Sequence, residues 1–127
     1  MLSALAGLMV LAEWTQDEAL SAAMRRLPEA LDKAVRCDWN ALLEGLDGKS
    51  SLYILGRGPS QPIAAEVALK FKETSGMHAE AYSAAEVLHG PVSIVGQGFP
   101  VLAITLPDET EAHVLEVCKR VAGQGAN

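Results

Sequence analysis

The sequence predicts an α/β fold in which a helical segment precedes a parallel sheet with helices on both faces. Three observations support this prediction. Residues 1–45 place apolar side chains at helical spacing. The run SLYILGRG at 51–58 combines apolar and aromatic side chains with a glycine-rich end. The later segments alternate between strand-like and helix-like patterns. Strands that alternate with helices are typical of parallel sheets.

The helical segment opens with the apolar run MLSALAGLMVLAEW. This run lacks the basic region of a signal peptide and is too short to span a bilayer, so we predict no membrane role for it. We expect a buried or interface helix whose partner surface need not lie wholly within this chain. A second helical stretch covers 17–44, and Pro28 is expected to break or kink it.

A turn-rich stretch at 46–50 marks the point where the periodicity changes, so we divide the chain into a helical segment at 1–45 and an α/β domain at 46–127. We predict a strand in the SLYILGRG run, a helix at 61–74, a strand at 77–82, a short helix at 83–89, a strand at 100–106 and a final helix at 108–122 capped by Asp108. Gly123 and Gly125 look like a turn that leads to another strand, so we expect a fragment of a longer chain.

The composition of the 127 residues is typical of an acidic globular domain. Half of the residues are apolar and the formal net charge is −6, and no basic patch with interleaved aromatic residues is present, so nucleic acid is a poor candidate partner. Cys37 and Cys118 are isolated, and His78 and His113 have no neighbours at metal-ligand spacing. We therefore expect no metal, no cofactor and a reducing, cytoplasmic location.

The turn Gly56-Arg57-Gly58 follows the first predicted strand. Parallel sheets commonly bind ligands at this edge, because glycines allow close approach and the next helix presents free N–H groups to an anion. The third glycine of a dinucleotide fingerprint is missing, Pro59 and Pro62 alter the turn, and no acidic residue lies where one would hold a ribose, so a dinucleotide site is disfavoured. A tight turn without a ligand is as good an interpretation as a binding turn.

Glu66, Lys70 and Glu73 are spaced four and then three residues apart on the next predicted helix. A 100° step per residue places Lys70 about 40° and Glu73 about 20° on either side of Glu66, so all three share one face. The far face is apolar and carries Ala64, Val67, Ala68 and Phe71. Geometry alone favours a solvated charged surface over an active site, because such pairs are common on exposed helices.

Two further patterns follow the second predicted strand. Ser83 and Glu86 fit a capping box, in which the two side chains satisfy N–H groups at a helix start. His89 precedes a Gly-Pro bend, where an imidazole can project into a cleft and exchange protons near neutral pH. A helix cap is an equally good interpretation of His89.

Two stretches, LYILGRGPSQPIAAEVALKFKETS and HAEAYSAAEVLHGP, together resemble the sugar isomerase (SIS) domain family, and in particular the second SIS domain of amino-sugar phosphate isomerases. The resemblance implies a flavodoxin-like, three-layer α/β sandwich. It also implies two SIS domains per chain and a homodimer with a shared active site. On this interpretation residues 1–45 are the end of a first SIS domain plus a connector, and 46–127 are a second SIS domain truncated at its C-terminus.

The resemblance implies a role for each candidate residue. Glu73 matches the carboxylate that moves a proton between C1 and C2 of the open-chain sugar phosphate, and His89 matches the histidine that helps open the sugar ring and reaches the site from the neighbouring subunit. Lys70 matches the lysine near the reacting carbon atoms, and Glu66 the carboxylate beside it. The residues expected to bind substrate are Gly56, Arg57, Gly58 and Ser60.

The implied function is a phosphosugar isomerase that acts on glucosamine 6-phosphate or fructose 6-phosphate, as a deaminase or as an aminotransferase. The Ser/Thr-rich loop that holds the phosphate in the family lies mainly in the first SIS domain, so we expect the isolated segment to be inactive. Leu88 stands where the synthases commonly carry a basic residue, so deaminase and synthase both stay open. The alternative function is a module that senses sugar phosphates without turnover, and a scaffold with a decayed site is a third.

Overall fold

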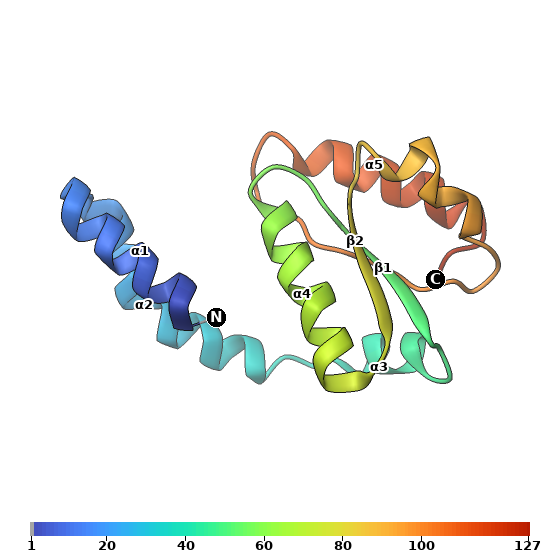
Figure 1. Cartoon of the computed structure of the whole chain (residues 1–127), viewed down its shortest axis with the longest axis horizontal. Helices are drawn as coiled ribbons and strands as arrows, with labels where there is room; N and C mark the ends of the chain where they lie inside the picture. Colours follow the sequence, from blue (N-terminus) through green and yellow to red (C-terminus); the bar gives the residue numbers. More distant parts are fainter. Residues whose placement is uncertain (1) are drawn as a thin grey trace. The chain divides into compact units, whose positions relative to one another are not determined.

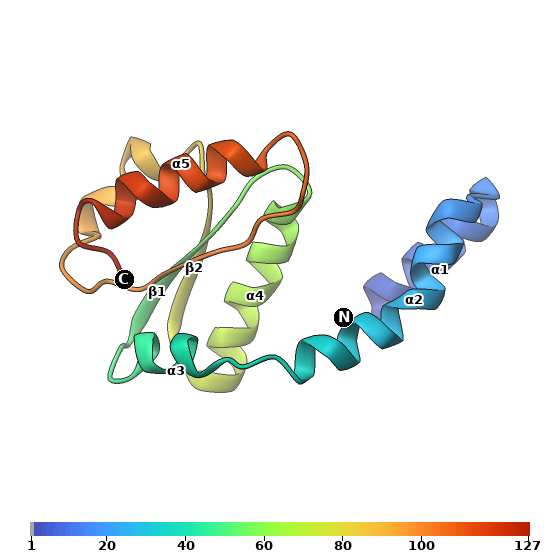
Figure 2. The same cartoon turned by 180° about the vertical axis from the view of Figure 1, so that it is seen from behind.

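The computed structural model describes residues 2–127, which form two compact units, one up to Asn40 and the other Ala41–Asn127. Figures 1 and 2 show a helical hairpin in the first unit and a sheet with its helices in the second. Among the described residues, no helix combines the length and the apolar character needed to cross a membrane.

The first unit consists of helices α1 (Leu2–Thr15) and α2 (Glu18–Val35). Asp17 starts α2, because its side chain accepts a hydrogen bond from the Leu20 N–H at 2.9 Å. The expected break at Pro28 is absent, since α2 continues through this residue as one helix. Proline removes a single backbone hydrogen bond, and the bonds of the remaining turns keep α2 continuous.

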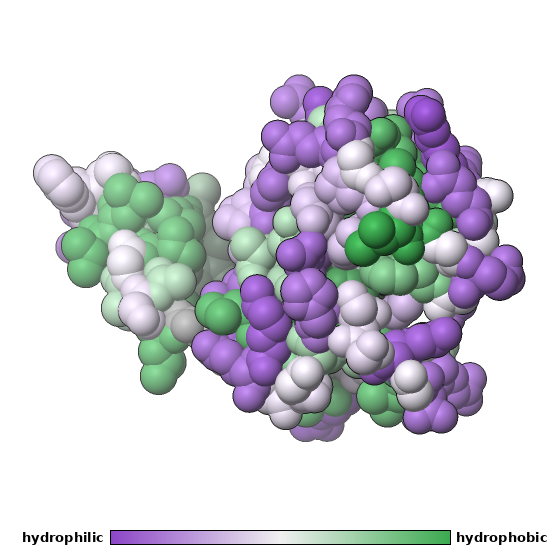
Figure 3. Space-filling view, turned by 45° about the vertical axis from the view of Figure 1, so that its right-hand side comes forward, coloured by the Kyte–Doolittle hydropathy of each residue, from purple (hydrophilic) through white to green (hydrophobic). Residues whose placement is uncertain are grey.

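The hairpin exposes much of its apolar surface. Within the described part of this unit Ala12 alone is buried, whereas Leu2 is 83% exposed and Val10 is 65% exposed. A groove of about 530 Å³ runs between the two helices and is lined mainly by apolar side chains, including Leu5, Met9, Met24, Leu27 and Leu31. Figure 3 shows hydrophobic side chains gathered over the hairpin. A helix that is apolar on all sides is typical of one buried in a larger assembly.

The second unit contains a sheet of three parallel strands in the order β2-β1-β3. Its elements are α3 (Asn40–Leu46), β1 (Ser51–Gly56), α4 (Ser60–Ser75), β2 (His78–Ser83), the 3₁₀ helices η1 (Val87–His89) and η2 (Pro91–Ile94), β3 (Val101–Ala103) and α5 (Glu111–Ala122). Helix α4 lies on one face of the sheet and α5 on the other (Figures 1 and 2). This arrangement confirms the predicted α/β sandwich with a parallel sheet.

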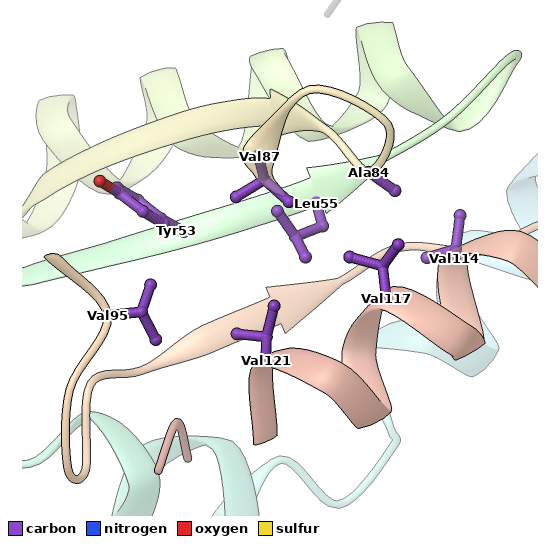
Figure 4. Close-up of a cluster of buried hydrophobic side chains, with 8 residues drawn as sticks. All are labelled: Tyr53, Leu55, Ala84, Val87, Val95, Val114, Val117 and Val121. Carbon is purple, nitrogen blue, oxygen red and sulfur yellow. The ribbon is translucent and has the colours of Figure 1, made fainter. Parts of the chain in front are cut away.

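Alternate side chains of β1 form two separate cores. Leu52 and Ile54 point to one face, where they pack against Ala64 and Ala68 of α4 and Ala79 of β2. Side chains of the other face pack against α5, and Figure 4 labels the buried members of this cluster: Tyr53, Leu55, Ala84, Val87, Val95, Val114, Val117 and Val121. The central strand therefore holds both helical layers, because successive side chains of a strand face opposite ways.

Several local predictions differ from the structure. The helical stretch predicted over 17–44 is interrupted, because α2 ends at Val35 and α3 begins at Asn40, and the short helix predicted at 83–89 is only the 3₁₀ helix η1. Ser83 forms no capping box with Glu86, because its hydroxyl accepts a hydrogen bond from the Ala85 N–H at 3.3 Å, and Glu86 precedes only the short helix η1. Asp108 does not start α5, which begins at Glu111. The third strand covers Val101–Ala103 and not the whole of 100–106.

Replacing Leu55 by alanine should lower the free energy of unfolding by about 2–5 kcal/mol, because the side chain is fully buried between the sheet and α5 and its loss leaves a cavity. Leu115→Ala is the matched control on α5, where the leucine is 47% exposed, and it should change stability by less than about 0.5 kcal/mol. Urea denaturation measures both. Equal losses for the two variants would contradict the described core.

Candidate active site

Glu66, Lys70 and Glu73 form a charged cluster on the outward face of α4, which we call the charged stripe. The Lys70 ammonium donates a hydrogen bond to Glu73 Oε2 at 2.6 Å and lies 3.6 Å from Glu66 Oε1. The hydrogen bond to Glu73 raises the pKa of Lys70, so the ammonium stays protonated. The three side chains are between 37% and 50% exposed, so a ligand on this face could reach them.

The surroundings of the charged stripe include two apolar side chains that the sequence analysis did not single out. Ile63 is 43% exposed and Leu69 is 41% exposed. On a helix with a 100° step, these residues lie about 60° on either side of Glu66. The sequence could have predicted their position beside the charged stripe, because Ile63 and Leu69 are each three residues away from Glu66 on the same helix. The outward face of α4 thus combines carboxylates, an ammonium and two partly exposed apolar side chains.

The glycine turn between β1 and α4 is held by Ser60. The Ser60 hydroxyl accepts a hydrogen bond from the Arg57 N–H at 2.9 Å and donates one to the Arg57 carbonyl oxygen at 3.0 Å. Gly56 is required here, because a Cβ at this position would lie 2.7 Å from the Ser60 carbonyl oxygen. Since Ser60 is 1% exposed, its hydroxyl shapes the turn, and its expected role in substrate binding stays a prediction.

Thr110 joins the loop before α5 to this turn. Its hydroxyl lies 2.6 Å from Asp108 Oδ1 and 3.2 Å from the Arg57 carbonyl oxygen, and its methyl group would lie 3.0 Å from a Cβ at Gly58. Hydrogen bonds from the Thr110 hydroxyl and N–H lower the pKa of Asp108. Residues 57 and 110 are too far apart in sequence for local pattern analysis to pair them.

His89 ends the 3₁₀ helix η1 and has an exposed side chain. The backbone N–H of His89 donates a hydrogen bond to the Glu86 carbonyl oxygen at 2.9 Å, and the next residue, Gly90, has a φ of 152°. The hydrogen bond and ion pairs of Lys70 described above involve Glu73 and Glu66, and His89 takes no part in them. The structure therefore brings Glu66, Lys70 and Glu73 together and leaves His89 on a separate turn.

Among the described residues, no group of three or more His, Cys, Asp or Glu side chains is placed to hold a metal ion. The acidic side chains of the charged stripe already contact the Lys70 ammonium. Such an arrangement can take up and release protons, since it combines a potential carboxylate base with a fixed positive charge.

The parallel sheet with helices on both faces is the fold of a known domain family. The SIS domain family matches residues 45–127, and the chain belongs to this family. A putative phosphosugar isomerase from Silicibacter pomeroyi has a similar structure, with a TM-score of 0.88 and 51% identity over 98% of this chain and 38% of its own. The C-terminal domain of glucosamine-fructose-6-phosphate aminotransferase from Francisella tularensis has a TM-score of 0.74 and 34% identity over 91% of this chain and 31% of its own.

Curated relatives are similar in sequence as well. The glutamine-fructose-6-phosphate aminotransferase of Sulfolobus acidocaldarius is 49% identical over 82 residues, which are 62% of this chain and 14% of the relative. The Haemophilus influenzae protein of the same name is 38% identical over 105 residues, which are 81% of this chain and 17% of the relative. The chain therefore spans less than a fifth of the length of these relatives.

Gly56→Ala should destabilise the second unit by about 1–3 kcal/mol, because the added methyl group would collide with the backbone of Ser60. Gly96→Ala is the matched control, since a Cβ there meets no atom within 4 Å. Thermal or urea denaturation compares the two variants. A neutral Gly56→Ala would contradict the close approach of the turn.

Thr110→Val should raise the pKa of Asp108 toward its ordinary value of 3.8, because the variant removes the hydroxyl hydrogen bond but keeps the shape of the side chain. A carboxyl group with a lowered pKa in the folded state stabilises the fold above its unfolded pKa and loses this contribution as the pH falls through the folded pKa. The pH-dependent part of the stability difference between wild type and variant should therefore be fully present above the unfolded pKa of Asp108 and be lost as the pH falls through its folded pKa. Carboxyl-carbon NMR titration measures the pKa, and an unchanged Asp108 would refute the assigned bond.

Proposed function

We propose that this chain is the isomerase part of an enzyme that acts on glucosamine 6-phosphate or fructose 6-phosphate, as a deaminase or as an aminotransferase. The observation that carries the proposal is the Lys70 ammonium, which contacts the carboxylates of both Glu66 and Glu73 on the outward face of a SIS-domain helix. The names of the similar aminotransferases and of the similar phosphosugar isomerase support it.

In the proposed reaction Glu73 is the catalytic base. Its carboxylate takes the proton from one of the two carbons C1 and C2 of the open-chain sugar phosphate and returns it to the other. The Lys70 ammonium stabilises the negative charge that develops on the sugar oxygens between these steps, and Glu66 keeps the ammonium in place through the contact at 3.6 Å. His89 opens the sugar ring before proton transfer begins.

The glycine turn is the proposed substrate-binding element of this domain. Gly56, Arg57 and Gly58 lie at the carboxyl end of β1, where parallel sheets commonly bind ligands. Ser60 contributes by fixing the turn through its two hydrogen bonds to Arg57. The phosphate of the substrate contacts a loop of the first SIS domain in this proposal.

The proposed active protein is a cytoplasmic homodimer with two SIS domains per chain. Residues 1–45 are the end of the first SIS domain and a connector, and 46–127 belong to the second. The exposed apolar surface of α1 and the groove beside it support this assignment, because such a helix is stable only when another surface covers it. His89 reaches the active site of the neighbouring subunit in this arrangement.

In the full-length protein, Glu73→Gln should lower the exchange of C1 and C2 hydrogens with deuterated solvent by at least about 100-fold, because the amide cannot accept the proton. Proton NMR of fructose 6-phosphate or glucosamine 6-phosphate in D₂O measures this exchange. Glu116→Gln makes the same chemical change on an exposed position of α5 and should leave exchange unaltered.

Retained exchange in Glu73→Gln would reject the assigned base. Binding of the sugar phosphate by the wild type without any exchange would instead assign the protein to sensing. Release of ammonia from glucosamine 6-phosphate in the absence of glutamine would identify a deaminase, whereas a glutamine requirement in the formation of glucosamine 6-phosphate would identify an aminotransferase.

A further inference from the structure

The hydroxyl of Tyr53 connects the central strand to the turn that carries His89. Tyr53 lies in β1 and is 2% exposed, and its hydroxyl donates a hydrogen bond to the Pro91 carbonyl oxygen at 3.2 Å. Pro91 follows His89 by two residues and begins the 3₁₀ helix η2. A residue of the most buried strand is thereby in direct contact with the turn of a proposed catalytic side chain.

Two aromatic neighbours fix the ring of Tyr53. Its centroid lies 4.8 Å from that of Tyr82 and 4.9 Å from that of Phe99, and both pairs meet edge to face, with interplanar angles of 73° and 64°. Figure 4 shows Tyr53 on the core side of β1 that also carries Leu55. Because such edge-to-face packing restricts the ring, the position of the hydroxyl is set by the sheet.

The turn itself has few other hydrogen bonds to the sheet. Ser93 N–H donates to the Gly90 carbonyl oxygen at 2.9 Å and His89 N–H donates to the Glu86 carbonyl oxygen at 2.9 Å, so both bonds stay within the turn. Between residues 87 and 95, the hydrogen bonds described by the structure include one that reaches β1, and Tyr53 donates it. Val87 and Val95 anchor the two ends of this segment in the core, and the Tyr53 hydroxyl adds a polar contact at Pro91, next to Gly90.

We infer that Tyr53 is a positioning residue that holds the Gly90-Pro91 bend and thereby sets the place of the His89 imidazole. The inference rests on the proposed function where it gives His89 a role in ring opening. Phenylalanine at position 53 would keep the ring and its edge-to-face contacts but leave the Pro91 carbonyl oxygen without this donor. If removal of the Tyr53 hydroxyl alone affects His89, then the bond to Pro91, and not the packing of the ring, positions His89.

The test compares Tyr53→Phe with Tyr82→Phe in the 127-residue chain. Tyr82→Phe is the comparison for packing, because the Tyr82 ring lies against Tyr53 and its hydroxyl, which donates to Glu80 and also interacts with the Tyr53 hydroxyl, makes no bond to the turn itself. In Tyr53→Phe we expect shifted NMR signals for the His89 ring and the Gly90 amide and about three- to tenfold faster hydrogen exchange at Ser93. Tyr82→Phe keeps the bond from Tyr53 to Pro91 and should change these three signals less than Tyr53→Phe.

Two results would overturn the inference. If neither variant changes the His89 ring and Gly90 signals, the Tyr53 hydroxyl does not hold the bend. If both variants change these signals equally, general packing, and not the bond to Pro91, sets the position of His89. Thermal denaturation of both variants confirms that the NMR spectra compare folded proteins.

A kinetic comparison in the full-length protein links the bend to turnover. Tyr53→Phe should lower kcat severalfold with little change in KM, because His89 is displaced while the residues that bind substrate are intact. An unchanged kcat beside the expected NMR shifts would reject the ring-opening role of His89 and leave the positioning result standing. If Tyr53→Phe does not shift the His89 ring and Gly90 signals, the positioning role of Tyr53 is rejected, whatever the outcome for Glu73→Gln.

Discussion

Close packing of α4 on the sheet determines the orientation of the proposed site. Ala64 and Ala68 are 0% and 2% exposed and lie against a surface that includes Ala79, so small side chains face each other across the contact. Larger side chains at these positions would force the helix away from the sheet or rotate it. Because one face of α4 is fixed in this way, Glu66 and Lys70 must face outward.

The charged stripe contributes little to stability, and its role in chemistry is a proposal. Exposed ion pairs contribute little to folding, since water screens the charges and the side chains lose freedom when they pair. Lys70 nevertheless contacts two carboxylates, and the closer one, on Glu73, is hydrogen-bonded at 2.6 Å. A carboxylate held beside a fixed ammonium suits a reaction that moves a proton while negative charge develops on the substrate. The resemblance to the SIS domain family is the reason for assigning the base to Glu73, and this geometry is compatible with that proposal.

The sequence predicted the features that depend on short-range periodicity. The strand in the SLYILGRG run, the helix that follows it and the shared face of Glu66, Lys70 and Glu73 are all confirmed, because each follows from the spacing of side chains along one element. Contacts that join distant residues were missed: the Thr110 hydroxyl meets Arg57 across 53 positions, and the Tyr53 hydroxyl meets Pro91 across 38. The capping box failed for a local reason, since the Ser83 hydroxyl bonds to the Ala85 N–H instead. The assignment of His89 to the same site as Glu73 depends on family resemblance and stays a prediction.

The most direct test of the account is a crystal structure of the full-length protein with a bound hexose 6-phosphate. The account predicts that a Glu73 carboxylate oxygen lies about 3–3.5 Å from C1 or C2 of the sugar, with the Lys70 ammonium beside the sugar oxygens. A sugar bound away from α4, with Glu66, Lys70 and Glu73 all facing solvent, would contradict it.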